Sequence, residues 1–120
     1  MVLVDTSVWI DHLRKNVPAL QELLHEGAVA IHPFVLGELA CGRLKDRAIV
    51  LGHLKALPAA TMASEDEVLK LLDERRLWGR GIGWIDAHLI TSALLSHSVL
   101  WTHDEKLGLV AAEVRAARST

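Results

Sequence analysis

The sequence predicts an α/β fold in which helices cover both faces of a central parallel sheet. Short apolar segments without polar alternation, such as Val2–Val4, are typical of strands buried on both faces. Longer segments with apolar residues at helical spacing lie between them. Strands that alternate with helices along a chain form a parallel sheet with three layers, α/β/α. The 120 residues fit one domain, so we expect a single domain over 1–120.

Proline and glycine set the expected boundaries in the first half of the chain. Apolar residues recur at helical spacing from Ser7 to Glu26, and Pro18 divides that stretch because the residue before a proline avoids the helical region. Gly42 ends the helix that Pro33 opens, since glycine is common just past a helix C-terminus. The expected elements are, in order, a strand over 2–4, two helices within 7–26, a strand over 28–31, and helices over 33–41 and 44–57.

The second half begins with an ambiguous segment and a clear helix start. Pro58 limits residues 57–61 to a weak strand at a sheet edge. Ser64 and Glu67 form a capping box, which marks the beginning of a helix. The expected elements are a weak strand over 57–61, a helix from 64 to about 78, a helix over 84–96, a strand over 98–102 and a helix from about 104. The sheet then has four strands, and a fifth stays open because residues 110–115 are typical of a continuing helix.

Charge and composition exclude several classes of protein. The chain carries 13 Lys and Arg against 15 Asp and Glu, which excludes a generally basic nucleic-acid coat but leaves room for a local basic patch. Its single cysteine, Cys41, excludes an intrachain disulfide and a four-cysteine zinc site. No segment approaches the roughly 20 apolar residues of a membrane span, and the short apolar start lacks the features of a signal peptide. We therefore expect a cytoplasmic protein with no membrane partner.

Four acidic residues are expected near the edge of the sheet where open α/β sheets bind ligands. Asp5 directly follows the first strand, and Asp104 comes shortly after the last clear strand. Asp86 lies in the first turn of the helix before that strand, and Glu38 lies within the helix after the second strand. If the first and last strands are neighbours, the four carboxylates converge. Helix capping, the helix dipole and simple solvation are the ordinary alternatives for these side chains.

Converging carboxylates indicate a bound divalent cation, because like charges would otherwise raise one another's pKa. Mg²⁺ and Mn²⁺ prefer such oxygen ligands. Ions held in this way suit phosphodiester hydrolysis, in which the metal activates a water molecule and polarises the phosphoryl oxygen. The acidic residues therefore predict a metal-dependent hydrolase of phosphodiester bonds.

Four motifs carry a resemblance to a known family. They are VLVDTSVWID at residues 2–11, PFVLGEL at 33–39, GWIDAHL at 83–89 and LWTHD at 100–104. With these motifs, in this order and at these intervals, the chain resembles PIN-domain ribonucleases, specifically VapC-type toxins of toxin–antitoxin pairs, from residue 1 to about 112. The resemblance implies a small α/β/α fold with a parallel sheet. It departs from the family at the C-terminal end, where many relatives have another short strand.

The resemblance also implies site residues, a cofactor and partners. It makes Asp5, Glu38, Asp86 and Asp104 the catalytic, metal-binding acids. Among them we expect the three aspartates to hold Mg²⁺ or Mn²⁺, while Glu38 completes the set or positions the attacking water. Supporting hydroxyls are implied at Thr6 or Ser7 and at Thr102. The implied substrate is cellular RNA of the tRNA or rRNA class, and the implied partners are a cognate antitoxin and a second copy of the chain. Cleavage would leave a 5′ phosphate and a 3′ hydroxyl.

Basic and aromatic residues outside the motifs are weaker candidates. Arg43 and Lys45 follow the Glu38 helix, and Arg80 lies in the glycine loop 79–83, so these three are the candidate RNA contacts, with solvated surface as the alternative. Trp78 and Trp84 bracket that loop and are candidates for a dimer or antitoxin groove.

Histidines next to the acidic motifs, and two further tryptophans, are assigned separately. His12, His88 and His103 are candidate general acids or metal ligands, with surface or packing roles as the alternative. Trp9 and Trp101 flank strand ends and are expected in the core.

Two other functions remain as alternatives to the nuclease. A PIN-like scaffold could bind RNA or protein without cleaving, although retention of all four acids counts against it. A signal receiver domain shares the length and a Mg²⁺ site, but it needs paired acids after the first strand, whereas Thr6 follows Asp5 here. Phosphatases that begin with Asp-x-Asp are excluded, because Ser7 occupies the position of the second aspartate.

Overall fold

The computed structural model describes residues 1–118, and its centre is a parallel sheet that has three strands within this range. β1 (Val2–Val4) is the middle strand, between β2 (Val29–Ala30) and β3 (Val99–Trp101). Val4 lies opposite Trp101 in the register of β1 with β3. All three residues of β1 are buried, as expected for a strand without polar alternation.

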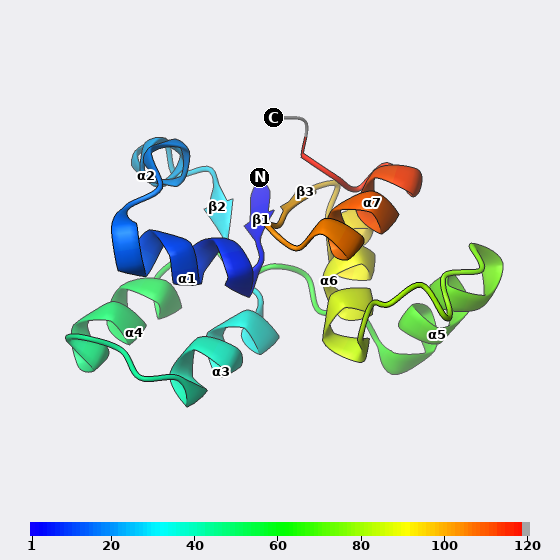
Figure 1. Cartoon of the computed structure of the whole chain (residues 1–120), viewed down its shortest axis with the longest axis horizontal. Coiled ribbons are helices and arrows are strands. Elements are labelled where there is room, and N and C mark those ends of the chain that lie inside the picture. Colours follow the sequence, from blue (N-terminus) through cyan, green and yellow to red (C-terminus); the bar gives the residue numbers. More distant parts are fainter. Residues whose placement is uncertain (119–120) are drawn as a thin grey trace.

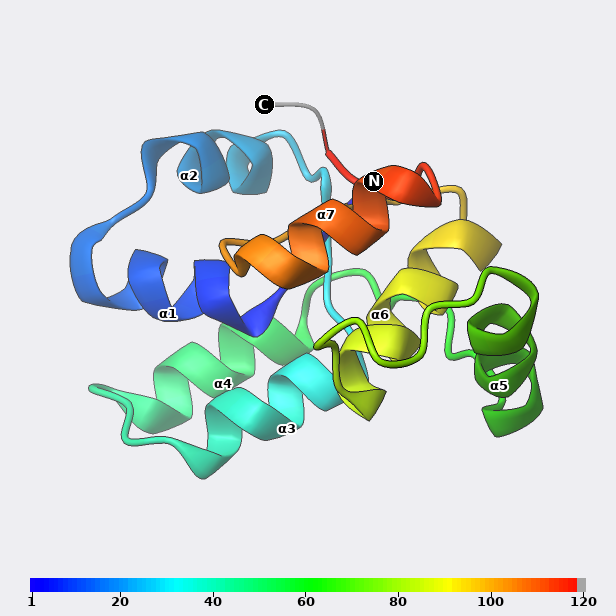
Figure 2. The same cartoon turned by 45° about the vertical axis from the view of Figure 1, so that its right-hand side comes forward.

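Seven helices surround the sheet in the described part of the chain. Figure 1 shows the helices of the first half of the chain on the side of β2 and those of the second half on the side of β3, and Figure 2 shows the same helices turned by 45°. The helices are α1 (Thr6–Lys15), α2 (Pro18–His25), α3 (Pro33–Cys41), α4 (Arg47–Lys55), α5 (Glu65–Glu74), α6 (Trp84–Leu95) and α7 (Glu105–Glu113). The predicted α/β fold with a parallel sheet is confirmed.

The prediction of a four-stranded sheet is wrong. Residues 57–61 and the segment around Ala117 each pair with the rest of the chain through a single residue. Ile31 forms an isolated parallel bridge with Ala59, and Leu100 forms one with Ala117. The first bridge cannot extend as a regular ladder, since Pro58 next to Ala59 has no N–H to donate. Residues 57–61 are therefore an edge contact, and the fifth strand left open from the sequence is likewise reduced to one bridge.

Helix boundaries follow the proline and capping signals closely, but two predicted helices are too long. The helix predicted over 44–57 spans only Arg47–Lys55, because Asp46 before it adopts a left-handed conformation with φ of 53°. Pro18 begins α2, and Ser64 and Glu67 form the predicted capping box of α5. The same helix ends at Glu74, four residues before the predicted end, because Arg76 adopts a left-handed conformation with φ of 53°. This turn directs Leu77 into the core, where its N–H donates to the carbonyl of Leu72.

Tryptophans divide between the core and the surface. Trp9 and Trp101 are buried, as predicted. Trp78 and Trp84, on either side of the glycine loop, are 61% and 42% exposed. Among residues 1–118, no helix has the length and apolar character needed to span a membrane.

Candidate active site

The adjacency of β1 and β3 brings Asp5 next to the loop that carries Asp104. The backbone N–H of Asp5 donates to the carbonyl of Trp101 at 2.9 Å, so pairing of the two strands continues to the first residue of the site. The first and last strands are therefore neighbours, as the convergence of the acids required. Parallel strands with helices on both sides leave their carboxyl ends open to ligands at such a point.

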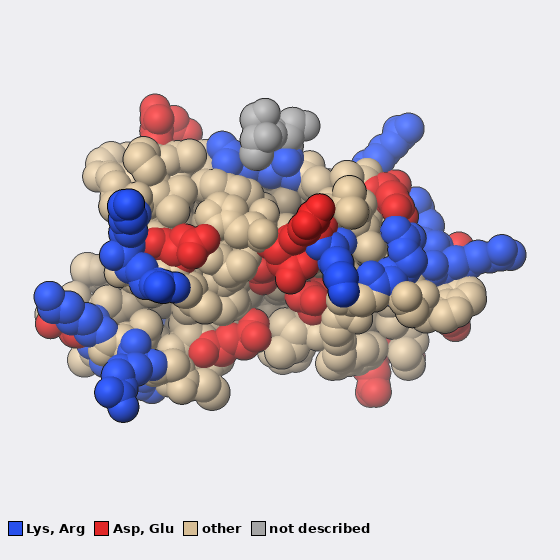
Figure 3. All heavy atoms as spheres, in the orientation of Figure 1, with Lys and Arg blue, Asp and Glu red and all other residues tan. Residues whose placement is uncertain are grey.

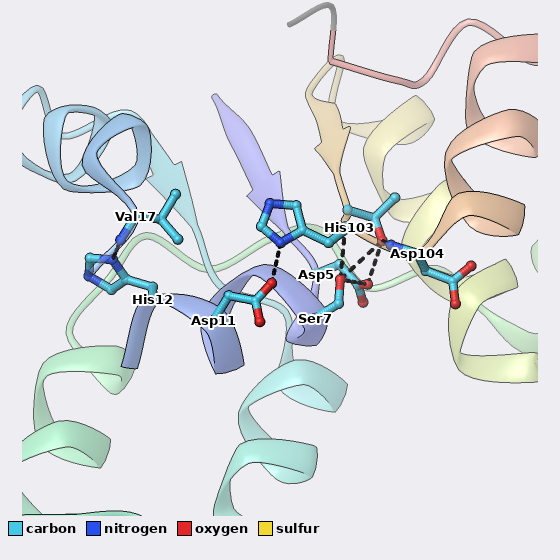
Figure 4. Close-up of polar contacts among 8 residues, drawn as sticks. Asp5, Ser7, Asp11, His12, Val17, His103 and Asp104 are labelled. Atoms are coloured by element: carbon cyan, nitrogen blue, oxygen red, sulfur yellow. Dashed lines mark hydrogen bonds and ion pairs between the residues drawn. The ribbon is translucent and has the colours of Figure 1, made fainter. Parts of the chain in front are cut away.

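Asp5 is buried and held by two hydroxyl groups (Figure 4). The Oγ of Ser7 and the Oγ1 of Thr102 donate to the same carboxylate oxygen, Oδ2, at 2.8 and 2.7 Å. Each hydroxyl also accepts a backbone N–H, from His103 for Ser7 and from Asp104 for Thr102. Each hydroxyl group thus links a backbone N–H of the β3–α7 loop to Oδ2 of Asp5. The other oxygen of Asp5, Oδ1, takes no part in these two links.

Asp104 combines a helix cap with a place at the site. Its Oδ1 accepts the backbone N–H of Leu107 at 2.9 Å, which makes it the N-cap of α7. Helix capping, the alternative role considered from the sequence, is therefore correct for Asp104. It occupies only one of the two carboxylate oxygens. The side chain is exposed at the rim of the site.

Glu38 reaches the site from α3, and its side chain accepts one hydrogen bond from the residues that the structure describes. The Oγ1 of Thr6 donates to its Oε1 at 2.8 Å. Glu38 is exposed, although several of its neighbours on α3 are apolar. Of the hydroxyls expected to support the acids, Thr6 contacts Glu38, while Ser7 and Thr102 contact Asp5.

Asp86 stands in the first turn of α6 and is partly buried. Its carboxylate accepts the N–H of Gly83 at 3.0 Å, so it also caps its own helix. The pKa of Asp86 is raised above its ordinary value, chiefly by burial and further by the negative charges of Asp5, Asp104 and Glu38, while the Gly83 hydrogen bond opposes the rise. Asp86 is therefore near enough to the other three acids for their negative charges to disfavour its ionised form.

The donor chemistry of this site fits a hard divalent cation. All four groups are carboxylates, and mutual repulsion is what a cation among them would relieve. Within residues 1–118, however, no three His, Cys, Asp or Glu side chains lie close enough together to hold a metal ion as they stand. A cation would therefore have to draw the carboxylates toward one another.

A hollow of about 600 Å³ adjoins Glu38 between α1, α3 and α4. Arg14, Arg43 and Lys45 line it together with apolar side chains that include Ile10 and Leu13. Figure 3 shows acidic side chains gathered near the middle of one face, with basic side chains mainly toward its two ends. Two of the three predicted RNA contacts, Arg43 and Lys45, thus border the same hollow as a site acid.

Arg80, the third predicted RNA contact, already has a partner. Its guanidinium group makes a two-pronged ion pair with Glu113 of α7. Lys106 crosses the same loop, and a Cβ on Gly81 would lie 2.7 Å from the Cδ of that lysine. Gly81 also has a φ of 82°, which favours glycine. The glycine loop is therefore fastened to α7.

The three histidines considered from the sequence have different surroundings. His12 accepts the N–H of Val17 through Nδ1 and lies away from Asp5 (Figure 4). His88 is buried and packs edge-on against Trp84. His103 is at the site, where its Nδ1 lies 2.5 Å from Oδ2 of Asp11. From the sequence, no role was predicted for Asp11. The available signal was its spacing of four residues from Ser7, which places both side chains on one face of α1.

A cluster of rings lies between the starts of α3 and α6, in which His32 and His88 are buried and Phe34 is half-buried. Phe34 packs against His32 and His88, with ring centroids 5.0 and 4.8 Å apart. His32 is the N-cap of α3, where its Nδ1 accepts the N–H of Phe34. Burial, together with the nearby His88, lowers the pKa of His32 to about 4. Sequence reasoning did not identify this cluster.

Comparisons with known proteins extend over nearly the whole chain. The family model described as PIN domain matches residues 2–113. Proteins named ribonuclease VapC32 in two strains of Mycobacterium tuberculosis, CDC 1551 / Oshkosh and ATCC 25618 / H37Rv, are 48% identical over 114 residues, which are 94% of this chain and 92% of each relative. The crystal structure of PAE2754 from Pyrobaculum aerophilum is similar with a TM-score of 0.60 and 26% identity, over 98% of this chain and 88% of that one. The likeness is therefore not confined to the acidic motifs.

Proposed function

The chain belongs to the PIN domain family, and we propose that it is a divalent-metal-dependent endoribonuclease of the VapC type, formed by one domain over residues 1–120. The resemblance to VapC-type PIN ribonucleases predicted from the motifs is confirmed. The observation that carries the proposal is the adjacency of β1 and β3, which brings Asp5 and Asp104 to one edge of the sheet with Thr102 hydrogen-bonded to Asp5. Ribonuclease VapC32 is named for its activity, and similarity over most of both chains supports the same activity here.

Each acid has its own part in the proposed reaction. Asp5, Asp86 and Asp104 would hold Mg²⁺ or Mn²⁺, and Glu38 would complete the set or orient the attacking water. A bound ion of this kind lowers the pKa of water and stabilises negative charge on the phosphoryl oxygen. The chain itself keeps Asp5 fixed through Ser7 and Thr102, so one ligand is oriented before any ion or RNA binds.

The basic side chains beside Glu38 support RNA as the substrate. Arg43 and Lys45 border the hollow that Glu38 also lines, so they can contact phosphates of a strand that enters the site. Arg80 can serve in this way only if its ion pair with Glu113 opens. The tRNA or rRNA class of target is proposed from the family resemblance.

Exposed apolar side chains support protein partners. Ile10 and Leu13 are about two-fifths exposed, at 43% and 40%, and both line the hollow beside Glu38. We propose that a cognate antitoxin covers this hollow and blocks access to the acids. A second copy of the chain is proposed to cover the exposed Trp78 and Trp84, which would bury their apolar surface.

Incubation of the purified chain with total RNA tests the proposal. With Mg²⁺ or Mn²⁺ we expect discrete fragments, none with EDTA, and at least about a 1000-fold lower rate for Asp5→Asn, because that change removes a metal ligand. Asp73→Asn, which removes an exposed carboxylate from α5, is the matched control and should cleave normally. Fragment ends should carry a 5′ phosphate and a 3′ hydroxyl.

Three results would contradict the proposal. Ends with a 2′,3′-cyclic phosphate would exclude attack by water. Cleavage that survives Asp5→Asn would place the activity elsewhere or in a contaminant. Absence of cleavage by folded, antitoxin-free protein would favour a scaffold that binds without cutting.

A further inference from the structure

The loop between β3 and α7 is fastened to α1 through one residue, His103. Its backbone N–H donates to Oγ of Ser7 at 2.9 Å, and its Nδ1 lies 2.5 Å from Oδ2 of Asp11. Ser7 and Asp11 are four residues apart, so they lie on the same face of α1 in successive turns. One helix face therefore holds both the backbone and the side chain of His103 (Figure 4).

His103 stands between two residues of the acidic site. Thr102 before it donates to Asp5, and Asp104 after it carries a site carboxylate at the start of α7. The ring of His103 also lies edge-on to Trp101, with centroids 5.9 Å apart. His103 is joined to each neighbour by a planar peptide bond, and only two backbone dihedral angles per residue can rotate. A fixed His103 therefore restricts the directions available to both side chains.

We propose that Asp11 is a positioning residue of the nuclease site, which acts by holding His103 and thereby the orientation of Thr102 and Asp104. The inference rests on the proposed function, since orientation matters only if these groups take part in cleavage. One oxygen of Asp104 is already occupied by the cap of α7, so a shift of the loop changes the direction of its other oxygen. Asp11 itself contacts neither substrate nor ion in this role.

Solvent exposure argues against a mainly structural role for the pair. The side chains of His103 and Asp11 are 37% and 50% exposed. Ion pairs with such access to water contribute little to the stability of a folded protein. The contact between His103 and Asp11 at the edge of the acidic site is therefore better explained by an effect on local geometry than by one on overall stability.

A variant series measured on one cleaved RNA separates these roles. With an oligonucleotide spanning a cleavage site of the wild-type chain, Asp11→Ala should lower kcat by about tenfold, with KM and the unfolding temperature nearly unchanged. Asp11→Asn should restore most of the rate, because the amide oxygen can still accept a hydrogen bond from Nδ1. Glu22→Ala, which removes an exposed carboxylate from α2, is the matched control and should have no effect.

The partner residue gives an independent second test. His103→Ala should cause the same loss of kcat, and the double variant should be no slower than either single one, because both changes break one interaction. Additive losses, a change in KM alone, or equal losses for Asp11→Ala and Asp11→Asn would overturn the proposal. A wild-type chain that cleaves no RNA would refute the proposed function and this inference with it. Wild-type rates for Asp11→Ala, with Asp5→Asn inactive, would refute the inference alone.

Discussion

Two halves of the acidic site are held together by different kinds of interaction. On the side of β1 and β3, Asp5 is fixed by hydroxyl groups that are themselves fixed by backbone N–H groups. On the side of α3 and α6, the hydrogen bonds seen in residues 1–118 are one from Thr6 to Glu38 and one from the Gly83 N–H to Asp86. The starts of these two helices also meet through the rings of Phe34 and His88. We infer that the first half is preorganised, whereas the second can adjust when a ligand binds.

Lowering the pH should destabilise the folded chain through the half of the site that contains the buried ring of His32. His32 has a pKa of about 4 in the folded chain against 6.5 for an ordinary histidine, so the unfolded chain binds more protons between these values. The free energy of unfolding should then fall as the pH is lowered from about 6.5 to 4, by about 3 kcal/mol from this residue alone. Above this window the contribution of neutral His32 is fully present.

Urea unfolding at several pH values, with His32→Asn beside the wild type, checks this prediction. Asparagine can still accept the N–H of Phe34 but does not titrate, so its curve should depend less on pH in this window. His88 acts in the same direction in both proteins, since burial lowers its pKa as well. Equal slopes for the two proteins would show that His32 does not couple folding to pH.

Removal of single hydroxyl groups should affect the two halves unequally. Thr102→Val breaks the hydrogen bond to Asp5 and also leaves the N–H of Asp104 without its acceptor. Thr6→Val breaks one exposed contact to Glu38. We expect kcat to fall by about tenfold for Thr102→Val and by less than about threefold for Thr6→Val, because the first change breaks two linked hydrogen bonds beside buried Asp5 and the second breaks one exposed bond. Thr102→Ser should retain activity, and a larger loss for Thr6→Val would reverse the comparison.

The smallest effect is expected from removing a charge in the adjustable half. Burial and three neighbouring carboxylates raise the pKa of Asp86, so its ionised form destabilises the fold at neutral pH. In EDTA, Asp86→Asn should therefore unfold at an equal or slightly higher temperature than the wild type, by a shift of about 1–3 °C. Addition of Mn²⁺ should stabilise the wild type but not the variant. A lower unfolding temperature for Asp86→Asn in EDTA would contradict the repulsion.

Local sequence signals predicted most of the fold and the positions of the acids. Pro18 and the Ser64–Glu67 capping box act within one helical turn, so their effects do not depend on the rest of the chain. From the sequence, adjacency of the first and last strands was the condition for bringing Asp5 and Asp104 together, and the pairing of Val4 with Trp101 fulfils it. The roles of the four acids in metal binding and catalysis stay predictions.

Long-range contacts account for what the sequence did not predict. Whether Ala59 and Ala117 extend strands or form single bridges depends on how far each segment follows its neighbour. The pairing of Arg80 with Glu113 joins residues 33 positions apart, and that of Asp11 with His103 joins residues 92 apart. Such pairs are set by tertiary packing, and neither residue of a pair has a local pattern that names its partner.

Anomalous diffraction from crystals grown with Mn²⁺ tests the central claim most directly. If the four acids form a metal site, a manganese peak should lie among the carboxylate oxygens of Asp5, Asp86 and Asp104. Asp86 should move more than Asp5 relative to the metal-free protein, because Asp5 is already held by Ser7 and Thr102. Manganese bound elsewhere, or absent from these carboxylates in crystals of protein that cleaves RNA, would contradict the account.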